Sequence, residues 1–232
     1  GNVLKNCKLP VKLLSSLTKA RKTIKEFQPD FAIGTGGFAS GPALFMAANL
    51  GVPIFVQEQN SLPGKTNTYL AKKAKAVFTA YPNMDHFFPK TKTFFLGNPV
   101  RKTIITDLID KELAKEQLGL DRNKLTILSV GGSLGSRTLN NGWKENVKQI
   151  TEKDYQLTRQ TGKLEYKELS ENSRISNLKS QISLKEFISD MALAYSAADV
   201  IVSRAGAIAI SELAMTKKPI VLVPFPFAAE DH

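Results

Sequence analysis

The chain has 232 residues, of which 42% are hydrophobic and 23% charged. This is ordinary globular composition, and the length allows one large or two small domains, each with a core of its own. The single cysteine, Cys7, excludes a disulfide framework and is typical of a reducing compartment. We find no secretory leader and no apolar run of membrane-spanning length, so we expect a soluble or peripheral chain.

In chain order, apolar strand-like segments alternate with segments that have helical spacing. The first helix is expected over 11–27, where apolar residues recur every three or four positions: Leu13, Leu14, Leu17, Ala20, Ile24 and Phe27. The expected strands are 31–37, 53–59, 76–80, 93–97, 125–132, 155–162, 182–187, 199–206 and 219–225. The other expected helices are 41–50, 66–74, a stretch after residue 101, 137–150, 163–170, 190–198 and 207–216. Strands that are apolar almost throughout are buried on both faces, so this alternation predicts parallel sheets with right-handed crossovers.

The net charge of +11 is concentrated in the first part of the chain. Residues 1–101 hold 14 Lys and Arg against 4 Asp and Glu, whereas residues 102–232 hold 18 against 17. This basic part is either a solvated face or a surface for nucleic acid or an anionic membrane. No nucleic-acid-binding motif accompanies it, so we expect no nucleic acid partner.

Glycine-rich or polar segments follow many of the expected strands. They are GTGGFASG (34–41), QEQNSLPG (57–64), GNPVR (97–101), GGSLGS (131–136), RQTGK (159–163), FISDM (187–191) and SRAGA (203–207). Each segment alone could serve only a tight turn. Because ligands of parallel sheets bind at the carboxyl ends of the strands, the recurrence of these loops indicates backbone contact with phosphates.

Two phosphate-binding motifs can be compared with these loops. GTGGFA fits the dinucleotide pattern G-x-G-x-x-A, and Glu58 ends the next strand where a ribose-binding acid is expected. PGKT (63–66) resembles the end of a P-loop, but Gln59 occupies the position that this motif reserves for glycine. The dinucleotide reading therefore stays open, and the P-loop reading fails.

Residues for acid–base or metal chemistry are few. The only histidines are His86 and His232, so we expect no metal site, and no Ser-His-Asp set is visible. Glu58 is either a solvated edge carboxylate or a group that faces a cleft. Glu212, near the start of a helix, could be there only to complement the helix dipole, and Arg101 and Arg204 could be plain surface pairs.

Several long segments nevertheless carry a specific resemblance, in this order: AIGTGGFASGPALFMAANLGVPIFVQEQNSLPGKTN, GNPVR, VGGSLGSRTLN, RQTGK, FISDMALAYSAADVIVSRAGAIAISELA and PIVLVPFPFAAEDH. Together they resemble the MurG family, the peripheral membrane glycosyltransferases of bacterial peptidoglycan synthesis. Family members transfer N-acetylglucosamine from UDP-N-acetylglucosamine to an undecaprenyl-diphosphate-linked muramyl-pentapeptide, with inversion and without a protein-bound metal or cofactor. The resemblance implies a hexosyltransferase at the cytoplasmic face of the plasma membrane.

The fold that this resemblance implies is α/β, with two Rossmann-like domains of GT-B type, each incomplete in this chain. Residues 1–101 would be the C-terminal part of the N-terminal, acceptor- and membrane-side domain. Residues 102–232 would be most of the domain that binds the UDP-sugar donor. We place the boundary at GNPVR, where Pro99 disfavours helix in the residue before it.

The resemblance also implies roles for single residues. Glu212 would bind the ribose hydroxyls, Ser133 a phosphate oxygen, and Ile188 the uracil through its backbone. The remaining donor-site positions are Asn60, Arg101, Ala207, Ile208, Ala209, Ile210 and Ser211. Glu58 matches a family acid beside the cleft and is the candidate general base within this chain.

The chain departs from the family pattern in three places. The opening strand, whose Gly-rich loop carries a histidine, is absent, and the chain stops at His232, before a glutamine that would contact the sugar. Phe38 stands where many members have tyrosine. We therefore expect a fragment with little activity, and we expect the family's base in the missing loop.

Three other functions stay open. The GTGGFA motif with Glu58 would suit an NAD-dependent oxidoreductase. The paired loops would also suit another GT-B enzyme, such as a UDP-N-acetylglucosamine epimerase. A non-catalytic binding subunit is the third, since eukaryotic relatives divide the two domains between chains.

The basic part is expected to face an anionic membrane surface. The candidate clusters are Lys5/Lys8/Lys12, Lys19/Arg21/Lys22/Lys25 and Lys72/Lys73/Lys75. The segment HFFPKTKTFF (86–95) could add a shallow anchor, although Phe94 and Phe95 are expected in a core strand.

Overall fold

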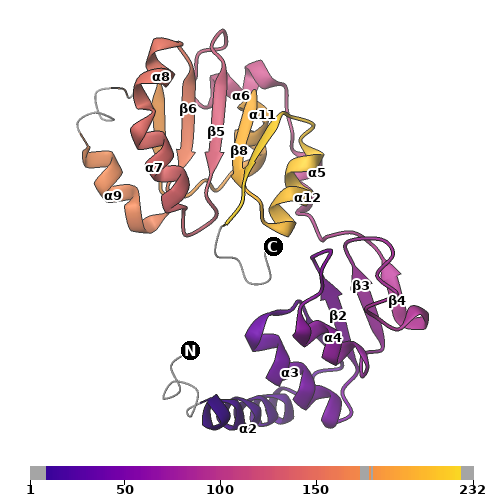
Figure 1. The fold of residues 1–232 in the computed structure, drawn as a ribbon. Coiled ribbons are helices and arrows are strands. Elements are labelled where there is room, and N and C mark those ends of the chain that lie inside the picture. Colours follow the sequence, from indigo (N-terminus) through magenta and orange to yellow (C-terminus); the bar gives the residue numbers. More distant parts are fainter. Residues whose placement is uncertain (1–8, 173–177, 179, 226–232) are drawn as a thin grey trace. The chain divides into compact units, whose positions relative to one another are not determined.

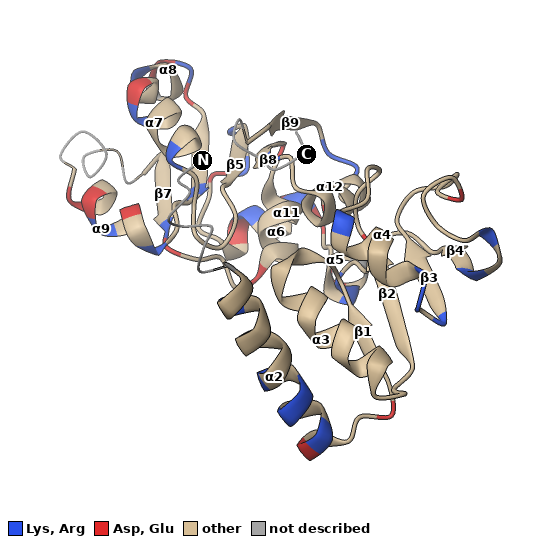
Figure 2. Cartoon of the chain, turned by 60° about the horizontal axis from the view of Figure 1, so that its bottom comes forward, with Lys and Arg blue, Asp and Glu red and all other residues tan. Residues whose placement is uncertain are grey.

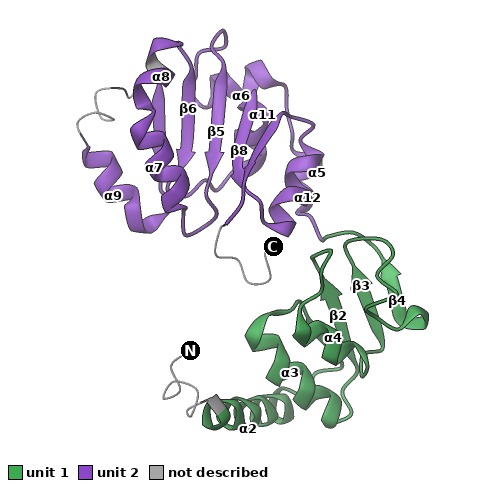
Figure 3. Cartoon of the chain, viewed as in Figure 1, with its two compact units in different colours: residues 1–98 green, residues 99–232 purple. Residues whose placement is uncertain are grey.

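The computed structural model describes residues 9–172, 178 and 180–225. The chain forms two compact units, Gly1–Asn98 and Pro99–His232 (Figure 3). Sequence analysis placed the boundary after Arg101, three residues further on. The expected strand that contains Leu96 and the expected strand around Leu128 belong to different sheets.

The first unit is a parallel sheet whose strands lie in chain order, β1-β2-β3-β4 (Figure 1). Its strands are β1 (Ala32–Gly34), β2 (Ile54–Glu58), β3 (Ala76–Thr79) and β4 (Thr93–Phe95). Its helices are α2 (Leu9–Phe27), α3 (Gly37–Asn49), α4 (Lys65–Ala71) and the short 3₁₀ helix η1 (Lys90–Lys92). Each strand alternates its side chains between two faces, so the two faces of this sheet carry different residues.

One face of the first sheet packs against helices. Ile54, Val56 and Val77 lie on this face and form a core with Leu44 of α3 and Leu70 of α4. Ile24 of α2 packs against the same core from its edge. The helices thus cover the face that also carries the side chain of Glu58, two positions after Val56.

The other face carries a row of phenylalanine rings. Phe31, Phe55, Phe78 and Phe94 stand 6.0, 6.1 and 6.3 Å apart from ring to ring. Phe94 is 49% exposed and Phe95 59% exposed. The expectation that these two residues lie in a core strand is therefore half wrong, because β4 is an edge strand whose side chains are exposed. Phe88 of the same segment is buried in the core instead.

The second unit is a five-stranded parallel sheet in the order β7-β6-β5-β8-β9. Its strands are β5 (Thr126–Val130), β6 (Gln156–Gln160), β7 (Ile182–Lys185), β8 (Val200–Arg204) and β9 (Ile220–Val223). Its helices are α5 (Lys102–Thr106), α6 (Lys111–Gln117), α7 (Arg137–Glu145), α8 (Val147–Glu152), α9 (Lys163–Glu171), α11 (Met191–Ala197) and α12 (Ala207–Met215).

Helices cover both faces of the second sheet, as near-continuous apolar strands require. Leu128 and Ile201 point into one core, with Ile104 of α5 and Tyr195 of α11. Leu157 and Ile182 point into the opposite core, with residues of α8 and α9. The unit is therefore a doubly wound α/β sheet, which confirms the predicted fold class.

Every predicted strand is present, with ends that differ by a few residues. The largest differences lie in the helices. α3 begins at Gly37 rather than residue 41, so Pro42 lies inside it. The helix expected over 137–150 is two helices, because Asn146 leaves helical geometry at the end of α7.

Candidate functional site

The chain order of the second sheet defines where a ligand would bind. From β5 the chain runs outward through β6 and β7, and then returns to the other side of β5 as β8. This reversal is the topological switch point of a parallel sheet, the usual place for a ligand. The loops after β5 and β8 flank it, and the loops after β6 and β7 follow along the same edge.

The loop after β5, 131–136, is a tight glycine turn that exposes Ser133. Gly135 donates its backbone N–H to the Gly132 carbonyl at 3.0 Å, and both glycines have positive φ, +81° and +85°. Ser136 then caps α7, its hydroxyl accepting the N–H of Leu139. Ser133 thus lies at the tip of a loop that leads into a helix N-terminus, a position where anions commonly bind in proteins.

This loop packs directly on the turn after β6. A Cβ added at Gly135 would lie 2.0 Å from the Thr161 carbonyl oxygen, and one added at Gly162 would lie 2.3 Å from that of Leu134. Asn140 of α7 donates its side-chain amide to the same Thr161 carbonyl at 3.0 Å. Only glycine allows the two backbones to approach this closely.

Arg101 and Glu212, two predicted donor-site residues from distant parts of the chain, form an ion pair in the second unit. The Arg101 Nε and Nη2 atoms donate to the two Glu212 carboxylate oxygens, both at 2.9 Å. The Glu212 side chain is only 10% exposed, whereas that of Arg101 is 53% exposed. This two-pronged pairing holds the carboxylate in one orientation, and each oxygen keeps a further lone pair for a ligand.

The charges of the Arg101–Glu212 pair change the pKa values of Arg101 and of the nearby Tyr195. Hydrogen bonding to Glu212 raises the pKa of the Arg101 guanidinium, against the opposing effect of burial. Burial, reinforced by the Glu212 carboxylate, raises the pKa of Tyr195 to about 12. Tyr195 was not a predicted site residue; it is buried in the core and close enough to feel both charges of the pair.

The start of α12 combines small side chains with a helix end that no side chain caps. Gly206 is its N-cap residue and makes no side-chain hydrogen bond. The first turn runs through Ala207, Ile208 and Ala209, and Ile210 is the first residue whose N–H bonds back to Gly206. The first turn of a helix lies at the positive end of the helix dipole, which favours an anion nearby. Ser211 points back to the Ala207 carbonyl at 3.1 Å.

Arg204, at the end of β8, has a structural role. Its Nη1 atom donates to the carbonyls of Val223 and Pro224, and its guanidinium lies over the Phe225 ring, 5.1 Å from the centroid. These partners are backbone carbonyls and an aromatic ring, rather than the surface ion pair considered from the sequence.

Ile188 lies in the loop after β7, where a backbone contact with a base was predicted. Asp190 two residues later caps α11 by accepting the N–H of Leu193 at 2.9 Å. The loop is therefore fixed at its helical end, which keeps the Ile188 backbone close to the edge of the sheet.

In the first unit, Glu58 is a buried carboxylate, 2% exposed, rather than a solvated one. One oxygen accepts the backbone N–H and side-chain amide of Asn60, at 3.0 and 3.3 Å. The other accepts the Gly64 N–H at 3.2 Å and the Asn67 amide at 2.8 Å. Glu58 and Asn60 are therefore brought together, with Glu58 organising loop 57–64.

The same loop is tied to its neighbours. The Gln59 side chain donates to the Thr35 carbonyl of the GTGG turn, and Gln57 donates to Asn98 of GNPVR. Asn98 in turn donates to the Gln59 carbonyl at 3.2 Å. Three predicted loops of the first unit thus form one polar network.

Sequence reasoning missed Asn67. It is 2% exposed on α4, and it binds both Glu58 and the Gln57 carbonyl. An asparagine at a core position of a helix, directly after a Pro-Gly turn, was the available signal. In the described part of the chain, no group of three or more His, Cys, Asp or Glu is arranged to hold a metal ion.

Two sequence models of one family match most of the chain. The glycosyltransferase family 28 N-terminal domain matches residues 1–79, and the C-terminal domain of the same family matches residues 126–232. The two matches fall in the two structural units.

Curated relatives align along the whole chain. A UDP-N-acetylglucosamine–N-acetylmuramyl-(pentapeptide) pyrophosphoryl-undecaprenol N-acetylglucosamine transferase of Parabacteroides distasonis is 48% identical over 232 residues, 100% of this chain and 63% of its own length. The transferase of the same name from Phocaeicola vulgatus is 48% identical over 231 residues, 100% of this chain and 61% of its own. The chain thus spans about three fifths of the length of these relatives.

Solved structures agree on the fold. The crystal structure of MurG from Acinetobacter baumannii is 33% identical, with a TM-score of 0.66, and the match covers 96% of this chain and 60% of that one. A UDP-GlcNAc 2-epimerase from Neisseria meningitidis, bound to UDP-GlcNAc, gives 0.64 at 16% identity, covering 90% and 63% of the two chains. At that identity the epimerase shows a shared fold alone.

Proposed function

The chain belongs to glycosyltransferase family 28, and from this we propose that it is part of an inverting transferase of peptidoglycan synthesis. The donor is UDP-N-acetylglucosamine, and the acceptor is an undecaprenyl-diphosphate-linked muramyl-pentapeptide. The names of the relatives, at 44–48% identity, support this substrate pair over the epimerase alternative. Because the chain spans only part of their length, transfer is proposed for the whole protein and donor binding for this chain.

The Arg101–Glu212 pair is the observation that carries the donor proposal. A buried carboxylate held by a bidentate arginine is suited to hydrogen-bond two adjacent hydroxyl groups, as on a ribose. The positive end of the α12 dipole, which begins after the N-cap Gly206, and the Ser133 hydroxyl at the tip of loop 131–136 would face the diphosphate. Ile188, from the loop after β7, would hold the uracil through its backbone carbonyl, because its N–H already donates to the Gln160 side chain.

In the transfer step, an acceptor hydroxyl attacks the anomeric carbon of the sugar. The new glycosidic bond forms as the bond to the UDP oxygen breaks, UDP leaves, and the hydroxyl proton passes to a base. Donors aimed at the diphosphate stabilise the charge that develops on the leaving UDP. Glu58 is a poor base for this step, because its two oxygens already accept four hydrogen bonds. We infer that it holds Asn60 and loop 57–64 in place.

For the dinucleotide alternative, the same contacts are unfavourable. A ribose-binding acid needs free acceptor oxygens at the strand end, whereas the Glu58 oxygens are occupied by its own loop. The GTGG turn is tied to that loop through Gln59.

The first unit also carries features that suit an anionic membrane surface, the second partner we propose. Lys12, Lys19, Arg21, Lys22 and Lys25 of α2 are exposed, and so are Lys72, Lys73 and Lys75 (Figure 2). Lys5 and Lys8 lie outside the described residues. Basic side chains near an anionic bilayer contribute about 1 kcal/mol each. No helix in the described ranges is long and apolar enough to cross a bilayer.

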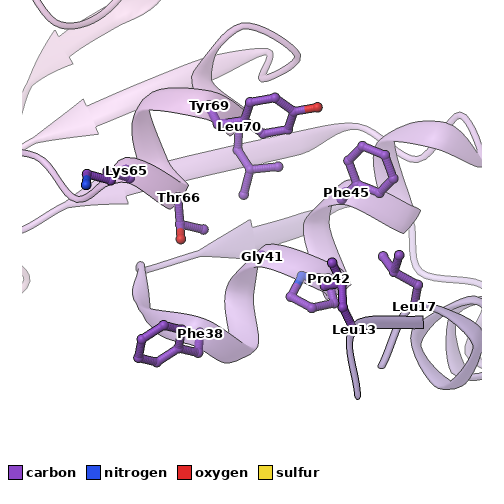
Figure 4. A pocket seen from close by; sticks show the side chains of 10 residues that line it. All are labelled: Leu13, Leu17, Phe38, Gly41, Pro42, Phe45, Lys65, Thr66, Tyr69 and Leu70. Atoms are coloured by element: carbon purple, nitrogen blue, oxygen red, sulfur yellow. The ribbon is translucent and has the colours of Figure 1, made fainter. Parts of the chain in front are cut away.

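Apolar side chains lie beside these lysines. Val11, Leu13 and Leu14 of α2 are more than half exposed. A pocket of about 480 Å³ opens between α2, α3 and α4, and Figure 4 shows Leu13, Phe38, Phe45 and Tyr69 around it, among others. Exposed apolar area next to basic side chains is the pattern of a peripheral membrane contact.

Titration calorimetry of the chain with UDP-N-acetylglucosamine and with NAD tests the donor proposal. We expect UDP-N-acetylglucosamine and UDP to bind, and NAD at the same concentration not to bind. Proton NMR of the UDP-sugar sample should show no epimer. Binding of NAD alone, or epimerisation by the chain, would overturn the proposal.

A further inference from the structure

Gln160 is a buried amide that joins two of the loops described above. It is the last residue of β6, it is 5% exposed, and sequence analysis gave it no role. In the sheet it stands between Val130, which precedes the glycine loop, and Lys185, which precedes the loop of Ile188. Its position is therefore central to the edge where the donor is proposed to bind.

The side chain of Gln160 makes one hydrogen bond to each loop. Its Nε2 atom donates to the Gly132 carbonyl at 2.9 Å, and its Oε1 atom accepts the backbone N–H of Ile188 at 2.9 Å. Gly132 uses the same carbonyl to close the turn with Gly135, 3.0 Å away. One planar amide thus sets the spacing between the turn that carries Ser133 and the backbone of Ile188.

The chemistry of these two contacts requires an amide. A carbonyl oxygen on one side needs a donor, and a backbone N–H on the other side needs an acceptor. An ionised carboxylate offers only acceptors, and an apolar side chain offers neither. Because Gln160 is buried and both bonds are partly buried, either change leaves at least one of these backbone groups without its protein partner.

We infer that Gln160 is a positioning residue that fixes the base-binding end of the donor site relative to its phosphate-binding end. The inference rests on the proposed function, which assigns uracil to Ile188 and a phosphate to Ser133. A nucleotide that spans both ends gains affinity only when they are correctly spaced. Gln160 should therefore govern how much the diphosphate adds to the binding of the nucleoside.

The test compares the affinities of uridine and UDP for the chain, by calorimetry or NMR titration. In Gln160→Met, the ratio of UDP affinity to uridine affinity should fall about tenfold, since two partly buried hydrogen bonds are lost. Gln160→Glu keeps an acceptor for the Ile188 N–H and loses the donor to the Gly132 carbonyl. Uridine should therefore bind nearly as in wild type, while the ratio of UDP affinity to uridine affinity falls. Amide hydrogen exchange at Ile188, measured without nucleotide, should speed up in Gln160→Met and much less in Gln160→Glu.

Gln156→Met is the matched control. Gln156 is also buried, at 2% exposure, and lies at the opposite end of β6, where it binds Asp121 and Thr126. Its loss should lower stability and leave the affinity ratio unchanged. If Gln160→Met and Gln156→Met give the same ratio, the inference falls while donor binding stands. If Gln160→Met does not fold, the ratio in Gln160→Glu decides. If wild type binds no UDP, the proposed function fails and the inference with it.

Discussion

At the scale of single residues, the second unit keeps two carboxylates that are held by cations at opposite ends of its sheet. Glu212 meets Arg101 at the carboxyl ends of the strands, where a ligand would bind. Asp199 precedes β8 at the other end, and its oxygens accept from Lys111 and Lys115, both at 2.8 Å. The first pair is accessible and suited to recognition, whereas the second supports the fold, with Lys115 only 2% exposed.

Removing the Asp199 charge should destabilise the second unit. Asp199→Asn leaves the buried Lys115 ammonium without its counter-ion, which typically costs about 3–5 kcal/mol of unfolding free energy. The exposed pair of Lys124 and Asp154 provides the control, and Asp154→Asn should cost about 0–1 kcal/mol. Urea denaturation measures both, and equal losses would show that Lys115 does not depend on Asp199.

The same carboxylate makes stability depend on pH. Burial alone would raise the pKa of Asp199, but hydrogen bonds from Lys111, Lys115 and the Thr126 N–H outweigh it and lower this pKa from 3.8 to about 2. Because the folded pKa lies below the unfolded one, the stabilisation is complete above about pH 4 and disappears as the pH falls toward 2. In denaturation experiments at falling pH, the difference in unfolding free energy between wild type and Asp199→Asn should therefore shrink between about pH 4 and pH 2. A constant advantage down to pH 2 would contradict the assignment.

Glu212 should matter for the donor rather than for the fold. In Glu212→Gln, a charged acceptor is replaced by a neutral amide, and UDP affinity should fall by about 1.5–3 kcal/mol. Arg101 is half exposed and can be solvated when its partner is lost, so unfolding free energy should change little. Calorimetry with UDP measures the first effect, and the exposed Glu168→Gln serves as control. Unchanged UDP affinity in Glu212→Gln would refute the ribose assignment.

At the scale of elements, the second unit depends on close approach between loop 131–136 and the turn after β6. Gly135 and Gly162 make that approach possible because neither has a Cβ and both have positive φ. The row of phenylalanine rings on the first sheet, in contrast, is not closely packed by other elements in the described ranges. It is an apolar face that the described part of the chain leaves partly exposed.

Substitutions of two glycines seven residues apart, Gly135 and Gly142, should therefore have opposite effects on stability. Gly135→Ala would bring a Cβ to 2.0 Å from the Thr161 carbonyl at a φ of +81°, so it should destabilise the unit strongly or prevent folding. Gly142 lies inside α7 with open space around it, so Gly142→Ala should stabilise by about 0.5–1 kcal/mol. Thermal unfolding distinguishes the two, and similar melting temperatures would disprove the close packing of the loops.

At the scale of the whole molecule, charge is divided between the two units. Most of the net charge of +11 lies in residues 1–98, which hold 13 Lys and Arg against 4 Asp and Glu and form the unit that also presents the apolar residues of α2. Attraction between such a surface and an anionic bilayer is screened within about 10 Å at 0.1 M salt. Binding that depends on these lysines should consequently weaken as salt rises.

Vesicle flotation of the chain tests this proposal. The chain should bind vesicles that contain phosphatidylglycerol better than purely neutral ones, and salt should weaken the binding. Replacing Lys19, Lys22 and Lys25 together by Gln should weaken it by about 1 kcal/mol per lysine. The same change at Lys144, Lys153 and Lys167 of the second unit is the control. Equal binding to neutral and anionic vesicles at low salt would leave these lysines as solvated surface.

The sequence alone determined the alternation of strands and helices. The spacing of apolar residues and the length of apolar runs reflect the local geometry of each helix or strand. Parallel sheets followed from the buried character of the strands, and the ends of strands such as β5 and β8 located the loops that we propose face the donor. Long segments such as FISDMALAYSAADVIVSRAGAIAISELA carried the family resemblance, because several of them occur in the family's order.

Only the tertiary structure decided which partner each polar residue has. Arg101 pairs with Glu212, and Gln160 joins Gly132 to Ile188, although these residues lie far apart in the sequence. The oxygens of Glu58 accept hydrogen bonds from the loop that follows it, a fold that no local pattern predicts. It also decided that Phe94 is exposed while Phe88 is buried, although both lie in one apolar segment. Local sequence patterns report which face of an element is apolar. Strand order and packing determine what that face meets.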